Sequence, residues 1–196
     1  SLMHKVFIDY INSKISVQLK DSEAELLSQT FLPKKLRKHQ YLLQEGEVCR
    51  FAGFIVKGAL KQYTVDKTGK ESILGLYIEN WWVGDRESFM VGTPSPYFIE
   101  ALEEVEMLIV SREDFIAKLG GQMFVNEMIK VLTEKQSFNL IKRIQAAQTL
   151  SAEERYEDFQ KKYPEFLQRF PQHIIASYLG MTKETLSRIR AGSAKK

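Results

Sequence analysis

The sequence has little cysteine and histidine for its 196 residues. A single thiol, Cys49, cannot form a disulfide within the chain or build a four-cysteine zinc or iron–sulfur site. The three histidines, His4, His39 and His173, form no HxH or HxxxH pair, so we expect no metal site and no cofactor. We expect the Cys49 thiol to be buried and inert, with a redox switch as the alternative.

Long hydrophobic runs are also missing. The apolar segments are too short to span a bilayer. The first residues lack the basic region and the following apolar core of a signal peptide, so none is expected. We therefore expect a cytoplasmic protein with no membrane partner. A hydrophobic fraction of 44% is ordinary for a globular protein, and this length allows one or two domains with a real core.

Net charge is small in the body of the chain and concentrated at its end. The formal net charge is +3. From Gln172 to Lys196 there are five lysines and arginines and one glutamate, which makes this segment +4 and leaves −1 for everything before it. A basic end on a nearly neutral body favours a polyanionic partner, and a solvated basic tail is the simpler alternative.

The pattern of apolar residues and glycines changes along the chain. Helical spacing of apolar residues predicts helices over 3–15 and 21–29. From Lys34 to Val110, short apolar segments are separated by glycines, which is typical of an all-β sandwich or barrel. Asp66–Glu71 is predicted to form a hairpin turn in which Gly69 adopts a positive φ.

Helical patterns return after the strands. Ser111 and Ser151 each begin a capping box, so a helix is expected to follow each of them. Between them, 122–149 contains neither proline nor glycine and predicts one long helix of about 40 Å. Its apolar stripe is wide, so we predict that this helix forms a dimer interface, with a plain core helix as the alternative. The predicted interface residues are Phe124, Met128, Val131 and Phe138.

The spacing of four residues near the end is typical of a helix-turn-helix. Ala176 is small where two helices would cross, and Gly180 can adopt the left-handed conformation of a tight turn. Leu186 and Ile189 lie one turn apart and are expected to point inward. Thr182 is expected to cap the second helix with its hydroxyl.

The second helix of this motif would carry polar residues on its outer face. Lysine and arginine can donate to guanine, and glutamate can accept from cytosine. The simpler alternative is a surface helix with an ion pair between Glu184 and Arg188, which would contribute only about 0.3–0.5 kcal/mol. We favour DNA binding because the spacing and the charge asymmetry agree. The outward-facing residues are Lys183, Glu184, Ser187 and Arg188.

The order of these segments resembles the Crp/Fnr family of bacterial transcription regulators, and most closely its compact branch typical of Bacteroidetes-type bacteria. "HIIASYLGMTKETLSRIR" carries the most specific match, and "QEGE" and "VKGALK" fit the turns of the family's β-roll. The resemblance implies an α+β fold: an antiparallel, jelly-roll-like β-roll with flanking helices (3–120), a dimerisation helix (121–149) and a small helical DNA-binding domain (150–196). Whether that domain has a wing is open.

The resemblance also implies roles for individual residues. Lys183, Glu184 and Arg188 match the family's base-contacting positions, and Ser187 shares their face. Thr182 and His173 are expected near phosphates of double-stranded DNA.

The cyclic-nucleotide cassette departs from the family pattern. Gly84 and Asp85 match the Gly-Glu pair that holds the ribose in cyclic-nucleotide binders. Ten residues further on, Ser95 and Pro96, followed by Tyr97, replace the pair whose arginine grips the cyclic phosphate. A buried phosphate without that guanidinium has no countercharge, so we expect no binding of cyclic AMP. The pocket then takes another ligand or has lost its ligand.

Three functions compete at this point. The first is a homodimeric transcription regulator that reads a palindromic DNA site, for which RNA polymerase would be a further partner. The second is a ligand-binding β-roll protein whose helical C-terminus binds another protein. The third, a cupin-like enzyme, is disfavoured because the sequence has no histidine cluster and no paired carboxylates at catalytic spacing.

Overall fold

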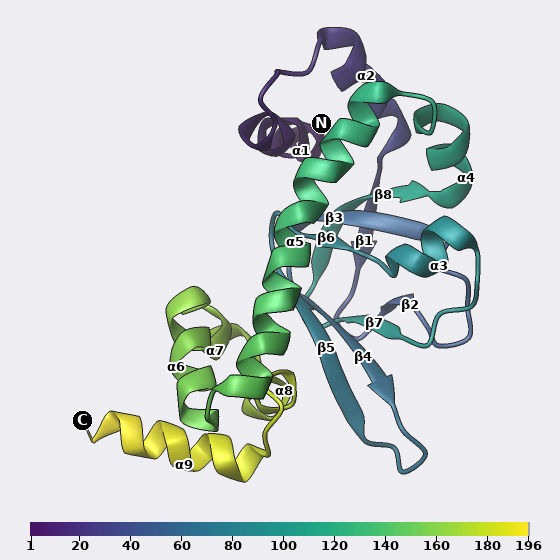
Figure 1. Ribbon diagram of the computed structural model, residues 1–196. Coiled ribbons are helices and arrows are strands. Elements are labelled where there is room, and N and C mark those ends of the chain that lie inside the picture. Colours follow the sequence, from purple (N-terminus) through teal and green to yellow (C-terminus); the bar gives the residue numbers. More distant parts are fainter. Residues whose placement is uncertain (196) are drawn as a thin grey trace. The chain divides into compact units, whose positions relative to one another are not determined.

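The computed structural model describes residues 1–195, and these fall into two compact units (Figure 1). The N-terminal unit comprises Ser1–Thr64 and Gly75–Lys135. The C-terminal unit comprises Gln136–Lys196 together with a short segment from much earlier in the chain, Val65–Leu74. The C-terminal unit is therefore discontinuous in sequence.

Two four-stranded antiparallel sheets form the β-roll of the N-terminal unit, which confirms the predicted α+β fold. One sheet has the strand order β1-β8-β3-β6, and the other has the order β2-β7-β4-β5. The strands are β1 (Leu32–Leu36), β2 (Tyr41–Leu43), β3 (Phe51–Lys57), β4 (Leu60–Val65), β5 (Glu71–Tyr77), β6 (Trp82–Val83), β7 (Phe98–Ala101) and β8 (Val105–Ser111).

Strand β1 begins two residues before the predicted β-rich region and contains Pro33, although proline cannot donate to a strand ladder. The strand is at the edge of its sheet and pairs only with β8, with Pro33 opposite Leu108. An edge strand leaves one side of its backbone unpaired, so a proline is tolerated there.

A single core joins the two sheets to the helices of the N-terminal unit. Helices α1 (Leu2–Lys14) and α2 (Asp21–Thr30) confirm the two predicted N-terminal helices. The Phe7 ring of α1 lies 4.7 Å from the Phe31 ring and 5.1 Å from the Phe54 ring of β3, measured between centroids. All three side chains are buried, so the helices are held to the sheet by aromatic packing.

Short helical segments connect the strands to the long helix. Helix α3 (Arg86–Val91) was not predicted, because six residues give too little periodicity to recognise. The capping box at Ser111 is followed by α4 (Arg112–Asp114), where the Ser111 hydroxyl accepts a hydrogen bond from the Asp114 amide at 3.0 Å. This segment continues as a π-helical turn, η1 (Phe115–Leu119).

The predicted long helix is α5 (Met123–Thr149), which begins in the N-terminal unit and ends in the C-terminal unit. Its first half packs against the β-roll through Val125, Met128 and Leu132, which belong to the core. Within the described chain, neither this helix nor any other combines the length and the apolar character that a membrane span requires.

Four further helices follow in the C-terminal unit: α6 (Ala152–Lys162), α7 (Phe166–Arg169), α8 (Gln172–Tyr178) and α9 (Lys183–Ala194). The capping box predicted at Ser151 is confirmed, because the Ser151 hydroxyl accepts from the Glu154 amide at 3.2 Å and the Glu154 carboxylate accepts from the Ser151 amide at 3.0 Å. Aromatic rings of α6 and α7 form the small core, with Phe159 and Phe166 buried and their ring centroids 5.8 Å apart.

Candidate nucleic-acid interface

Helices α8 and α9 form the predicted helix-turn-helix. Helix α8 ends in a Schellman motif: the Met181 amide donates to the Ala176 carbonyl at 3.0 Å, and the Gly180 amide donates to the Ser177 carbonyl at 3.1 Å. Gly180 has φ +71°, which is the left-handed conformation expected of it. Two residues later, the Thr182 hydroxyl accepts from the Thr185 amide at 3.1 Å and caps α9. The turn is thus specified at both ends.

The inner face of this motif is apolar and buried, as the spacing predicted. Ala176 on α8 is 1% exposed, and Leu186 on α9 is fully buried. Ile189, one turn further along α9, is also buried. These contacts fix which side of α9 faces outward.

The outer face of α9 carries the polar residues that the sequence assigned to DNA. Lys183, Glu184, Ser187 and Arg188 are all exposed, and so are Thr182 and His173 nearby. One Arg188 nitrogen lies 3.4 Å from the Thr185 hydroxyl on the same helix. That contact is long for a hydrogen bond, so the guanidinium remains available to a ligand.

Two arginines that sequence reasoning missed hold the C-terminal end of α8. Arg143 on α5 donates to the Tyr178 carbonyl at 2.7 Å and lies 3.7 Å from the centroid of the Tyr178 ring. Arg155 on α6 donates to the Leu179 carbonyl at 3.1 Å and to the Leu150 carbonyl at 3.0 Å. Cations are favoured at this end of a helix because its last carbonyls lack partners. Both arginines lie in charged helical stretches, where no sequence pattern distinguishes them from surface residues.

Arg143 also binds strand β5 of the β4–β5 hairpin, within the early segment of the C-terminal unit. Its guanidinium donates to the Leu74 carbonyl and approaches the Ile73 carbonyl at 3.5 Å. In addition, the Ile73 amide donates to the Ser177 hydroxyl at 3.0 Å. Strand β5 of the hairpin is thereby joined to the last turn of α8, just ahead of the Gly180 turn.

The cyclic-nucleotide cassette is closed on itself in the N-terminal unit. The Asp85 carboxylate is buried and accepts from the Ser95 hydroxyl at 2.6 Å and from the Ser88 amide at 3.3 Å, so that it caps α3. Asp85 and Ser95, which are ten residues apart in sequence, therefore meet, but their polar groups are hydrogen-bonded to each other. Gly84 has φ +150°, Pro96 is exposed and Tyr97 is half-buried.

The two arginines near this cassette do not replace the missing phosphate-binding arginine. Arg86 is exposed, and Arg112 donates to the Phe89 carbonyl at 2.7 Å, at the C-terminal end of α3. Neither is held beside the carboxylate of Asp85 by a contact among the described residues. Within that part of the chain, no three metal-binding side chains are grouped to hold an ion.

Cys49 lies beneath the cassette. It is 2% exposed, its amide donates to the Ser88 hydroxyl at 2.8 Å, and its sulfur donates to the Phe51 carbonyl at 3.2 Å. Burial raises the pKa of the thiol, which reduces the fraction of reactive thiolate at neutral pH. The geometry fits the structural reading of this residue better than a redox switch.

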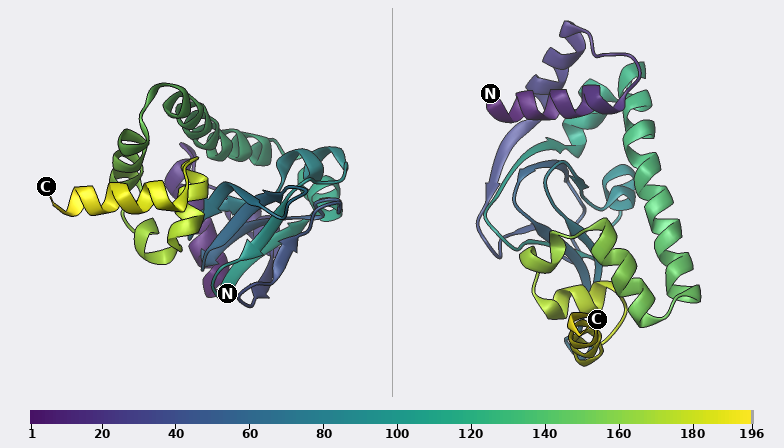
Figure 2. Two further views of the ribbon diagram at one scale, coloured as in Figure 1. Left: turned by 90° about the horizontal axis from the view of Figure 1, so that it is seen from below. Right: turned by 90° about the vertical axis from the view of Figure 1, so that its left-hand side faces the viewer.

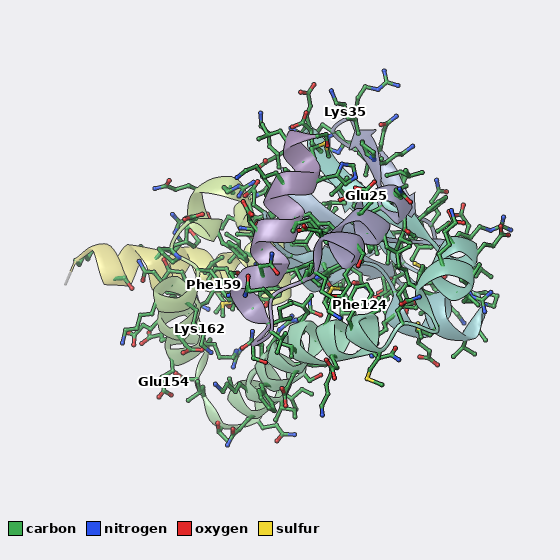
Figure 3. The ribbon with its side chains drawn as sticks, turned by 90° about the horizontal axis from the view of Figure 1, so that it is seen from above. Glu25, Lys35, Phe124, Glu154, Phe159 and Lys162 are labelled. Carbon is green, nitrogen blue, oxygen red and sulfur yellow. The ribbon has the colours of Figure 1, made fainter. Side chains whose placement is uncertain are left out.

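The four residues that the sequence assigned to a dimer interface lie on two different sides of α5. Phe124, labelled in Figure 3, is half-buried against the core, and Met128 is 2% exposed. Val131 and Phe138 are 41% and 55% exposed. Ile141, three residues after Phe138, is 62% exposed and extends the outer stripe. The first pair packs within the chain, and only the second pair remains available to a partner.

Comparison with known proteins agrees with this architecture. The family model of the cyclic nucleotide-binding domain matches residues 33–120. The anaerobic regulatory protein of Pasteurella multocida is 28% identical over 190 residues, which cover 89% of this chain and 68% of that protein. The fumarate and nitrate reduction regulatory protein of Vibrio cholerae is 26% identical, with 89% and 74% covered. The structure of FixK2 from Bradyrhizobium japonicum superposes with a TM-score of 0.72 at 18% identity, covering 84% of this chain and 85% of that one.

The chain therefore contains a cyclic nucleotide-binding-like domain, and along most of its length it is similar to transcription regulators of the Crp/Fnr type. Its relatives are regulators rather than enzymes, which removes the cupin-like alternative. Among the described residues, the C-terminal unit has a well-formed helix-turn-helix, whereas the cassette of the N-terminal unit has its polar groups paired internally.

Proposed function

We propose that this protein is a homodimeric, sequence-specific DNA-binding regulator of the Crp/Fnr type that acts in the cytoplasm, reads a palindromic site and works with RNA polymerase. The observation that carries the proposal is the outer face of α9, where Lys183, Glu184 and Arg188 are exposed on a helix whose start is fixed by the Gly180 turn and the Thr182 cap. In helix-turn-helix proteins, the first residues of the second helix contact base edges.

Selection of bound fragments from genomic DNA tests this function directly. We expect the purified protein to enrich a palindrome with half-sites about one helical turn apart, with affinity that falls steeply as salt is raised. The selection is run with and without a metabolite extract, which also reveals whether an effector is needed. A dimer that enriches no sequence in either condition would favour the alternative, a β-roll protein whose helical end binds another protein.

A substitution on α9 separates base reading from charge. Arg188→Ala is expected to weaken binding to the selected site by about 1–3 kcal/mol and to relax preference at one base position. Lys195→Ala, near the end of α9, is the control and is expected to weaken binding to all sequences alike. The measurement is titration of each variant against the selected site and against random DNA. If Arg188→Ala weakens both DNAs equally, Arg188 does not read a base.

Dimerisation through α5 supplies the two-fold symmetry that a palindrome requires. The outer stripe of Val131, Phe138 and Ile141 has spacings of seven and three residues, which is the repeat of a two-helix seam. Apolar side chains this exposed on one helix favour a partner, and a second copy of the same helix is self-complementary about a two-fold axis.

We expect this regulator not to respond to cyclic AMP. The Asp85 carboxylate, which would accept from a ribose hydroxyl, is already engaged by Ser95 and Ser88, and Ser95 stands where the family's arginine would bind the phosphate. Titration calorimetry with cyclic AMP is therefore expected to show no saturable binding, and thermal unfolding should be unchanged by the nucleotide. Micromolar affinity would contradict this prediction. Any other effector would have to bind through contacts other than those of the cyclic-nucleotide cassette.

A further inference from the structure

The β4–β5 hairpin ends in a rigid turn that belongs to the C-terminal unit. The Asp66 carboxylate accepts from the Thr68 hydroxyl at 2.6 Å, the Thr68 amide at 2.8 Å and the Lys70 amide at 3.0 Å. Hydrogen bonds from the Thr68 side chain and from the Lys70 and Thr68 amides lower the pKa of this carboxyl group. Gly69 has φ +86°, as expected for the turn. The tip is therefore a defined structure rather than a loose loop.

Strand β5, which follows this turn, is anchored beside the helix-turn-helix. Ile73 and Leu74 are bound by Ser177 and Arg143 at the last turn of α8, and α9 begins only four residues after that turn ends at Leu179. In Figure 1 the hairpin tip and the N-terminal end of α9 both lie at the bottom of the view. The left view of Figure 2 shows α9, in yellow, from below.

The reach of the tip matches the dimensions of DNA. Strand β5 begins at Glu71, so the three steps from Lys70 to the anchored Ile73 span about 10 Å of chain. The major groove is about 12 Å wide, with phosphates along both of its edges. A hairpin anchored at the turn before α9 can therefore meet the backbone that borders the groove into which α9 inserts its first residues.

The side chains at the tip are suited to phosphate contacts. Lys67 and Lys70 flank the turn and are exposed. Asp66 is turned toward the donors of its own turn. The tip carries as many acidic as basic residues from Asp66 to Glu71, so long-range attraction comes from the basic end of the chain, and the lysines act at short range. Lysine is a common partner of phosphate because its ammonium group is a compact point charge.

We propose that the tip of the β4–β5 hairpin is a second DNA-contacting element, in which Lys67 and Lys70 bind phosphates beside the groove read by α9. This proposal rests on the proposed function. In the C-terminal unit as described, 136–195 contains helices and no strands. Within this unit the hairpin would therefore supply the contact to DNA phosphates that a wing otherwise supplies.

The test compares two doubly substituted proteins with the wild type. Lys67→Gln with Lys70→Gln removes the two charges at the tip. Lys161→Gln with Lys162→Gln removes two charges from α6 in the same unit and is the matched control. Affinity for the selected palindrome and for random DNA is measured at several salt concentrations with the full-length protein.

The slope of log K against log salt counts phosphate contacts. We expect the tip variant to lose about 0.9 from the slope for each contact removed, to weaken on both DNAs, and to keep its ratio of specific to random affinity. Ethylation interference supplies a second readout: phosphates whose ethylation blocks the wild type at the edge of the site should no longer matter for the tip variant. The control should keep the wild-type slope and pattern.

Several results would overturn the proposal. A tip variant with the wild-type slope and interference pattern contacts no phosphates, whether or not transcription by RNA polymerase changes. Equal losses in the tip variant and the control would mean a general charge effect. If the wild type itself prefers no DNA sequence, the proposed function fails. If the wild type binds its palindrome and the tip variant has the same affinity and salt slope, only the proposal about the hairpin fails.

Discussion

The double substitution Phe138→Glu, Ile141→Glu is expected to give a folded monomer that no longer binds its palindromic DNA site tightly. Phe138 and Ile141 are more than half exposed on α5 and contribute little to the chain's own core. In a dimer seam, each glutamate would have to bury a charge without a partner, which costs several kcal/mol. A monomer engages only one half-site, and losing the second contact is expected to lower affinity by about a hundredfold or more.

Two comparisons make this experiment specific. Gln136→Glu with Asn139→Asp adds the same two charges to exposed positions on the other side of α5 and should leave a dimer. Met128→Ala removes a buried side chain and should lower the free energy of unfolding by about 2–5 kcal/mol without adding a charge to the seam. Sedimentation or light scattering gives the mass, and titration of the palindrome gives the affinity. A Phe138→Glu, Ile141→Glu protein that remains dimeric would exclude this face as the interface.

Arg143→Ala is expected to destabilise the C-terminal unit by about 3 kcal/mol. The substitution removes a guanidinium that serves the Tyr178 carbonyl and the Leu74 carbonyl and that stacks on the Tyr178 ring. Arg143→Lys should recover little of the loss, because an ammonium group lacks the planar fork that reaches several carbonyls at once and stacks on an aromatic ring. DNA affinity should also fall, since the turn before α9 loses its support.

The distribution of tryptophan allows the two units to be followed separately. Both tryptophans, Trp81 and Trp82, lie in the N-terminal unit, whereas the described C-terminal unit is mainly helical. Arg143→Ala should therefore lower the midpoint of the helical circular dichroism transition more than the midpoint followed by tryptophan fluorescence. Lys142→Ala, at the exposed neighbouring position, should shift neither. If both probes shift together, or if lysine restores full stability, the guanidinium is not the anchor that its contacts indicate.

Much of the DNA-reading end could be predicted because its signals are local. The helix-turn-helix depends on Gly180 at a left-handed position, Thr182 as a cap and small or apolar residues at fixed spacing, and each of these acts over a few residues. The capping box at Ser151 and the extent of α5 follow from equally local rules. The structure confirms all of these elements.

What could not be predicted depends on contacts between distant residues. The periodicity of α5 showed a wide apolar stripe but could not divide it, so Met128 was grouped with Phe138 although one is buried and the other exposed. The contact between Asp85 and Ser95 was missed because it forms only when α3 brings the two loops together. Arg143 carries no signal in the sequence, since its partners are backbone carbonyls of the hairpin and of α8.

The discontinuity of the C-terminal unit bears on how such regulators can be recombined. A fragment cut at Gln136 would retain Arg143 and Ser177 but would lack the backbone groups of Ile73 and Leu74 that they bind. A chimera that joins this DNA-reading end to a foreign sensor would inherit a foreign hairpin in the same position. The natural module for exchange is therefore not a single stretch of chain. It is the last third of the protein together with a ten-residue piece, Val65–Leu74, that lies within the sequence of the β-roll.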